Sequence, residues 1–168
     1  LHDLAEERLR LGHKQRGRTE EVEAKQAELA KALGWNAKAA RAHARRLPDS
    51  YWLAEPGDWI LGNARQIAEA EARIGPAEPS VVVDGETEGA TRVSVFAPDR
   101  PGLFYRICAG LAAAGASIVD ARIHTTRDGM ALDNLLVHDR QARPYGDRRR
   151  RQRLAREVLA ALSSEALP

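Results

Sequence analysis

The hydrophobic period of the sequence changes once, near residue 80. Before residue 75, apolar residues recur at three- and four-residue spacing, which is typical of amphipathic helices. From residue 80, short β-branched runs alternate with glycine-containing polar connections, which is typical of strands and hairpins. Gly75 and Pro76 interrupt the chain between these patterns. The sequence therefore predicts an α+β protein with a helical region over 1–78 and a sheet domain over 79–168.

The helical region is expected to contain four helices. Gly12 should end the first, and Thr19 is placed to cap a second helix that continues to Gly34. A third helical piece covers 36–46, and Asp58 is placed to cap the fourth.

The sheet domain begins with two β-branched runs around a polar turn, as in a hairpin. The expected order is strand, strand, helix, strand, strand and closing helix, over 80–84, 92–96, 103–111, 117–125, 131–137 and the segment after Asp147. Apolar and polar residues alternate over 117–125, so Val119, Ala121 and Ile123 should face the interior.

After the first run, the order βαββα lacks the last strand of a ferredoxin-like sheet. That strand would lie antiparallel to the first one at the sheet edge, and the C-terminal "SSEALP" cannot supply it. A hairpin would place residues 81–83 antiparallel beside 92–96. We therefore expect residues 80–84 to take the place of the missing strand.

The composition excludes several classes of protein. No apolar run approaches the roughly 18 residues of a membrane-spanning helix, and a net charge of +2 does not favour nucleic acid. Cys108 is the only cysteine, which excludes an internal disulfide and suits the cytoplasm. Because residue 1 is Leu rather than Met, we expect a piece of a longer protein.

The stretch "VFAPDRPGLF", residues 95–104, is the strongest candidate for a binding site. Gly102 lets the backbone approach a ligand, and the N–H groups of the following helical turn would favour a carboxylate. Asp99 suits an opposing ammonium group, and a free amino acid carries both charges. The alternative is an ordinary helix start with Asp99 as the N-cap.

Three stretches carry a family resemblance: "LPDSYWL" at 47–53, "APDRPGLF" at 97–104 and "ASIVDARIHTTRDGMALD" at 116–133. Together they resemble the ACT domain, an amino-acid-sensing regulatory module. The variant is similar to the first of two such domains in bacterial protein-PII uridylyltransferases/uridylyl-removing enzymes. The resemblance covers roughly residues 47–163, and residues 1–46 carry no motif.

The resemblance implies a nitrogen sensor. Enzymes of this family uridylylate the PII protein when glutamine is scarce and remove the groups when it is abundant, and the ACT region is taken to bind glutamine. Carried over by position, the effector-binding residues are Asp99, Arg100, Pro101, Gly102, Leu103, Ser117 and, more weakly, Asp120. Such sites usually form between two paired domains, so a second ACT domain or a homodimer is implied.

The same resemblance implies that this piece is not catalytic. The nucleotidyltransferase and hydrolase motifs of the parent enzyme, which would use Mg²⁺, are absent, so no cofactor is expected here. The dipeptide His2-Asp3 has no ligand cluster around it. Two alternatives stay open: a domain that senses a different amino acid, and one that serves only dimerisation or interdomain contact.

Two further features have alternative interpretations. The run "DRRRRQR" at 147–153 is either a solvated helix start or a contact for an acidic partner, and without interleaved aromatic residues it does not indicate nucleic acid. Tyr51, Trp52 and Trp59 either anchor the helical region to a neighbouring domain or to the sheet domain, or form a partner-binding patch.

Overall fold

The computed structural model describes residues 2–73 and 78–164, except for the side chains of residues 2–6 and 9. Contacts divide the chain into two units, residues 1–64 and 65–168. Gly75 and Pro76, which marked the predicted boundary, lie outside the described residues. None of the helices in the described ranges is long and apolar enough to cross a membrane.

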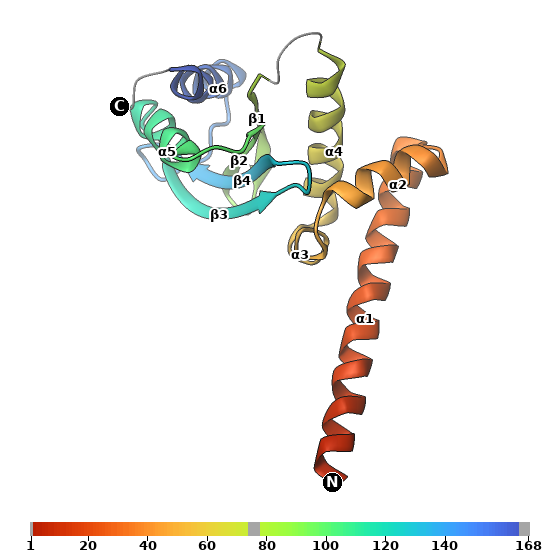
Figure 1. The fold of residues 1–168 in the computed structure, drawn as a ribbon. Helices are drawn as coiled ribbons and strands as arrows, with labels where there is room; N and C mark the ends of the chain where they lie inside the picture. Colours follow the sequence, from red (N-terminus) through yellow and green to blue (C-terminus); the bar gives the residue numbers. More distant parts are fainter. Residues whose placement is uncertain (1, 74–77, 165–168) are drawn as a thin grey trace. The chain divides into compact units, whose positions relative to one another are not determined.

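The first unit is helical (Figure 1). Its elements are α1 (His2–Leu33), α2 (Ala37–Arg46), α3 (Asp49–Ala54) and the beginning of α4 (Gly57–Ala72). Asn36 caps α2 by accepting a hydrogen bond from the Ala39 N–H at 2.9 Å. Lys25 ties α1 to α3, because its ammonium group donates to the backbone oxygens of Trp52 at 2.7 Å and Glu55 at 3.1 Å.

Three expected helix boundaries in this unit are wrong. Gly12 and Thr19 both lie inside α1, and the Thr19 hydroxyl donates to the Gln15 carbonyl instead of capping a new helix. An isolated glycine costs a helix only about 1 kcal/mol, and the Lys, Arg, Glu and Gln residues around it are good helix formers. Asp58 lies in the first turn of α4, which begins at Gly57, so it is not the cap either.

The three aromatic residues Tyr51, Trp52 and Trp59 of this unit are buried. Tyr51 and Trp52 are fully covered, and the Tyr51 hydroxyl hydrogen-bonds the Asn63 side chain at 3.1 Å. The His43 ring lies edge-on to Trp52 and to Trp35, with ring centroids 6.1 and 5.2 Å away. Tyr51 and Trp52 therefore do not form the exposed partner-binding patch that was one alternative.

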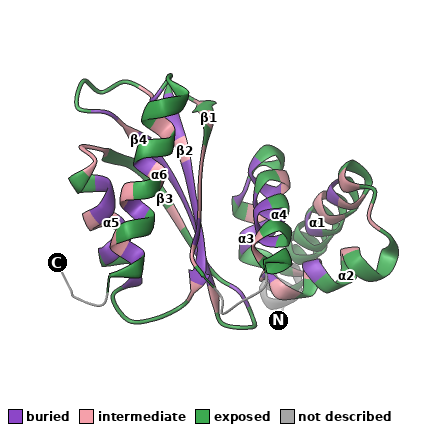
Figure 2. Cartoon of the chain, turned by 90° about the horizontal axis from the view of Figure 1, so that it is seen from above, coloured by how far each residue is buried: buried purple, intermediate pink, exposed green. Residues whose placement is uncertain are grey.

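The second unit contains a four-stranded antiparallel sheet with α5 and α6 on one face (Figure 2). Its elements, besides the end of α4, are β1 (Ser80–Thr87), β2 (Ala90–Pro98), α5 (Leu103–Ala113), β3 (Ser117–Thr125), β4 (Met130–His138) and α6 (Arg148–Ser163). The strand order is β1-β2-β4-β3. This arrangement confirms the predicted α+β, ferredoxin-like fold.

The predicted replacement of the missing strand is confirmed. Val81 lies opposite Val95 and Val83 opposite Val93 in an antiparallel ladder, so β1 occupies the edge beside β2. A tight turn at Glu88 and Gly89 joins the strands, and both residues have positive φ, at 54° and 74°. Such φ values match a two-residue hairpin turn whose twist suits the flanking strands.

The core lies between the sheet and the two helices. It is made by side chains from β2, β4, α5 and α6, among them Val93, Val95, Leu135, Ile107, Leu111, Leu154 and Val158. The two helices approach most closely at Gly110, where a Cβ atom would lie 2.8 Å from the Val158 Cα. On the other face, the Gln66 amide of α4 donates to the Ser80 and Ser94 backbone oxygens at 3.1 and 3.0 Å.

The expected buried face of β3 is wrong. Val119 and Ile123 are 53% and 50% exposed, and Ala121 is exposed as well. β3 is the edge strand beside β4, and α5 makes few contacts with it while α6 packs towards β1. The ladder with β4 shifts register between Ile118 and Asp120, which interrupts the alternation at Val119, and these helices do not cover Ala121 or Ile123.

Candidate functional site

The loop between β2 and α5 is a tight turn. The Leu103 N–H donates to the Arg100 carbonyl at 3.2 Å, Pro101 occupies the second turn position, and Gly102 has φ 77° and ψ 4°. These angles define a type II turn, which needs glycine at its third position. Asp99 lies outside the turn, and its N–H donates to the Gly129 carbonyl at 3.1 Å. Gly102 is the N-cap of α5, so the alternative of Asp99 as the N-cap is wrong.

Arg100 and Leu103 hold this loop to the rest of the domain. The Arg100 guanidinium donates to the Leu162 carbonyl and Arg106 to the Ser164 carbonyl, each at 2.5 Å. Both acceptors lie at the C-terminal end of α6, where helix carbonyls lack intrahelical partners and carry partial negative charge. Leu103 is buried in the core. Asp99, Pro101 and Gly102 remain exposed.

A buried carboxylate that the sequence analysis missed lies near this loop. Asp133 of β4 is 1% exposed and lies opposite Val95, so its side chain is on the face that α5 and α6 cover. Its Oδ1 atom has no hydrogen-bond partner in the described part of the chain. A signal was present, because Asp133 continues the alternation of the core residues Ala131 and Leu135.

The electrostatic environment of Asp133 links it to the loop. Burial and, to a smaller extent, the negative charge of Asp99 raise its pKa to about 6, while His124 opposes this shift. An opposite charge that entered between the two carboxylates would favour the ionised form of Asp133. The pair is therefore suited to an ammonium group, and the first turn of α5 presents backbone N–H groups suited to a carboxylate.

The structure does not bring Ser117 or Asp120 to this loop within one chain. Ser117 begins β3 opposite His138, whereas the loop lies at the other end of the sheet, where Pro98 faces Met130. The nine residues from Ser117 to Thr125 span about 26 Å of strand from the first Cα to the last. Asp120 lies opposite Leu136 beside an irregularity in the ladder and forms an ion pair with Arg122.

The described residues contain no group of three or more His, Cys, Asp and Glu side chains that could hold a metal ion. The side chains of His2 and Asp3 lie outside the described part of the structure. The site has the chemistry of a binding site for a charged small molecule, built from two carboxylates, a type II turn and a helix start.

Comparisons with known proteins show what this chain is similar to. Residues 91–150 match the ACT domain family. The chain is 44% identical over 171 aligned residues to a bifunctional uridylyltransferase/uridylyl-removing enzyme of Erythrobacter litoralis, which covers 98% of this chain and 18% of the relative. It is 42% identical to the enzyme of that name from Novosphingobium aromaticivorans, over 95% of this chain and 17% of the relative. The chain thus spans less than a fifth of the length of these relatives.

Proposed function

We propose that this chain is the amino-acid-sensing regulatory segment of a bifunctional uridylyltransferase/uridylyl-removing enzyme, with glutamine as its ligand. Two findings support this proposal: residues 91–150 match the ACT domain family, and nearly the whole chain is similar to a segment of such enzymes. The observation that carries the proposal is the pair of carboxylates, Asp99 and Asp133, beside the first turn of α5. The ligand ammonium lies between the carboxylates, and its carboxylate lies at the backbone N–H groups of the turn.

A second ACT domain completes the site in this proposal. The exposed apolar edge of β3 supports such pairing, because an open strand edge with apolar side chains invites another strand. If two β3 strands pair antiparallel, the beginning of one lies beside the end of the other. Ser117 of one domain then lies near the loop of its partner, which resolves their separation within one chain.

In the parent enzyme this segment has no catalytic role of its own. Glutamine binding changes the balance between uridylylation and deuridylylation of the PII protein by Mg²⁺-dependent domains elsewhere in the chain. We place this enzyme in the cytoplasm. The alternative is an ACT domain that serves only contact between domains. The observation that favours it is that Ser117 and the loop lie at opposite ends of the sheet in a single copy, so one unpaired domain has no complete site.

The test is calorimetric titration of the chain with glutamine, with Asp99→Asn and Asp133→Asn variants. Each variant should weaken binding roughly tenfold or more, because each removes a charged partner of the ammonium group. Glu86→Gln, an exposed carboxylate of β1, is the matched control and should bind like the wild type. No heat at millimolar glutamine would favour the contact-only alternative, and unchanged binding by Asp133→Asn would remove the proposed ammonium site.

Stability measurements separate lost binding from lost folding. The folded-state pKa of Asp133 is raised from 3.8 to about 6, so its contribution to stability is highest below pH 4 and is lost as the pH rises through 6. Asp133→Asn removes this loss and should stabilise the sheet domain at pH 8 by about 2 kcal/mol, after allowance for solvent screening. A variant that is more stable and yet binds less glutamine identifies Asp133 as a ligand-binding group.

A further inference from the structure

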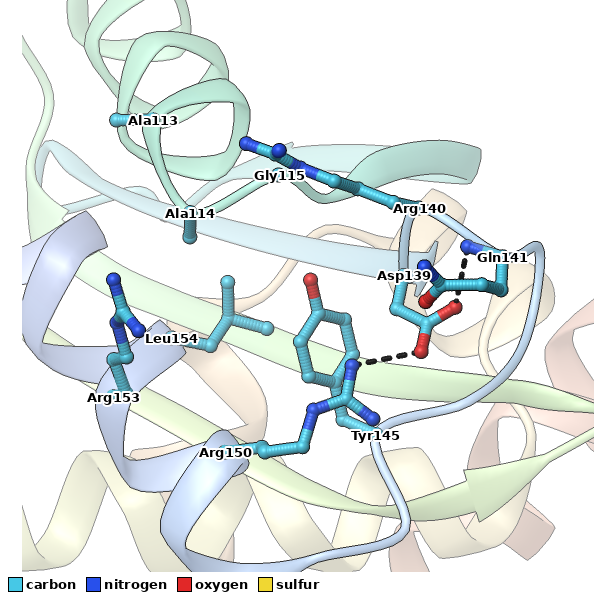
Figure 3. A pocket seen from close by; sticks show the side chains of 10 residues that line it. All are labelled: Ala113, Ala114, Gly115, Asp139, Arg140, Gln141, Tyr145, Arg150, Arg153 and Leu154. Atoms are coloured by element: carbon cyan, nitrogen blue, oxygen red, sulfur yellow. Dashed lines mark hydrogen bonds and ion pairs between the residues drawn. The ribbon is translucent and has the colours of Figure 1, made fainter.

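A cavity of about 330 Å³ lies at the other end of α5 from the loop at Asp99 (Figure 3). Its walls are the C-terminal end of α5, the connection after β4 and the first turns of α6. The volume is at the lower end of the range for small-molecule sites and corresponds to on the order of ten water molecules. The proposed glutamine site does not use this cavity.

Three arginines and one aspartate give the cavity its charge. The Asp139 carboxylate binds the Arg150 guanidinium at 2.7 Å and accepts hydrogen bonds from the backbone N–H groups of Gln141 and Arg143 at 2.9 and 3.0 Å. Its negative charge is therefore already compensated. Arg140 and Arg153 make no hydrogen bond or ion pair with any residue that the structure describes, which leaves an excess of two positive charges.

Two of the three arginines lie against neighbouring residues. The Arg140 side chain lies across Gly115, where a Cβ atom would come within 2.4 Å of its Nε atom. Gly115 also has φ 75° and ends α5. Arg150 stacks over the Tyr145 ring at 4.8 Å from the centroid. In Figure 3 the Arg140 side chain extends past Gly115 above the Tyr145 ring, and Arg153 lies next to Leu154.

The charge distribution along α6 is unusual for a helix start. Arg148, Arg149, Arg150 and Arg151 form its first turn, and the N-cap Asp147, whose side chain accepts a hydrogen bond from the Arg149 N–H at 3.1 Å, offsets only part of their charge. Cations at this end are unfavourable, because the helix dipole already makes it positive. The arginines still outnumber Asp147 and Asp139 at this end of α6. An anion that binds in the cavity would balance this excess of positive charge.

We propose that this cavity binds a small phosphate monoester dianion, with its phosphoryl group between Arg140 and Arg153. Two planar guanidinium groups suit the oxygens of a phosphoryl group, which they can bind in a bidentate manner. A zwitterionic amino acid fits poorly, because Asp139, the only carboxylate among the described residues that line the cavity, is occupied by Arg150 and two backbone N–H groups. Ala113, Ala114 and Leu154 provide apolar wall for the organic part of the ligand.

The test is an NMR titration of the ¹⁵N-labelled chain with glycerol 3-phosphate, with glycerol as the neutral control. Amide signals of residues 113–115 and 139–154 should shift with the ester and not with glycerol. Arg140→Gln and Arg153→Gln should each weaken binding roughly tenfold or more. Arg156→Gln removes a charge from the same helix outside the cavity. It should change the affinity less than about threefold, because an exposed surface charge contributes little to binding.

Three results would overturn the proposal. Absence of shifts at 10 mM glycerol 3-phosphate would exclude a specific site. It would mean that the binding free energy is weaker than roughly 3 kcal/mol. Equal losses in Arg153→Gln and Arg156→Gln would indicate attraction by overall charge. Inorganic phosphate or a phosphoserine peptide that binds more tightly through the same arginines would exclude a small phosphate ester as the preferred ligand. Each result is independent of glutamine binding at Asp99 and Asp133.

Discussion

His43 makes the stability of the helical unit depend on pH. Burial, with a smaller contribution from the positive charge of Arg46, lowers its pKa from 6.5 to about 4. The ring makes edge contacts with the indoles of Trp35 and Trp52, and its Nε2 atom has no hydrogen-bond partner in the described residues. A proton on this ring would carry its charge into an aromatic environment that cannot compensate it.

The sign of the dependence follows from the two pKa values. Between pH 6.5 and about 4, the unfolded chain binds a proton at His43 that the folded chain does not bind, so stability is complete above pH 6.5 and falls with pH. From pH 7.5 to 4.5, the helical unit should lose roughly 2 kcal/mol through this residue. His43→Phe should abolish this loss. Urea unfolding measures it specifically, because all three tryptophans, Trp35, Trp52 and Trp59, belong to this unit.

The control for this prediction is His13→Gln, which alters an exposed histidine of α1. It should leave the pH dependence of the tryptophan-detected transition as in the wild type. If His43→Phe and the wild type lose stability equally between pH 7.5 and 4.5, the ring is not the group that titrates.

At the scale of elements, the packing of α5 against α6 depends on Gly110. A Cβ atom there would lie 2.8 Å from the Val158 Cα and 3.1 Å from the Glu157 carbonyl oxygen, and both are backbone atoms that cannot move alone. Gly110→Ala gains about 1 kcal/mol of helix propensity but forces the helices apart, which typically costs 1–3 kcal/mol or somewhat more. We expect net destabilisation of the sheet domain, seen as faster hydrogen exchange in β2 and β4.

A matched substitution is available in α4. Gly62 has no atom within 4 Å of its ideal Cβ position, so Gly62→Ala should stabilise the chain by up to about 1 kcal/mol. A Gly110→Ala variant that gains stability to the same extent would show that the two helices do not pack closely there.

The types of the helices and strands were largely predictable from the sequence. Where they end and which of their faces are buried were less predictable. The hairpin of β1 and β2 followed from β-branched runs and turn residues that are close in sequence. The break at Gly12 was wrong because helix-forming neighbours outweigh one glycine. The exposure of Val119 and Ile123 was hidden from the sequence, because an alternating pattern identifies an apolar face without identifying what covers it.

At the scale of the whole molecule, the open edge at β3 predicts association. Val119 and Ile123 are exposed on a strand that pairs on only one side. The double variant Val119→Lys/Ile123→Lys should weaken self-association at least about tenfold, because charge at an edge strand opposes pairing with another strand. Sedimentation velocity over a concentration series measures this change.

Leu159→Lys is the control, because Leu159 is an exposed leucine on α6. It should associate like the wild type. Equal sedimentation of the wild type and the double variant at every concentration would mean that β3 is not the pairing edge of this chain, and that the edge is kept for a different domain.

The sequence by itself determined the α+β class, the β1 edge strand and the loop at Asp99. These features depend on hydrophobic periodicity, turn residues and short motifs, all of which involve residues that are close together in the sequence. Only the tertiary structure decided that Arg100 anchors α6 through Leu162, that Asp133 is buried near Asp99, and that β3 stays uncovered. The physical reason is that burial and charge depend on which distant segments pack together. The sequence of a strand does not show whether an aspartate in it is exposed to water or covered by a helix.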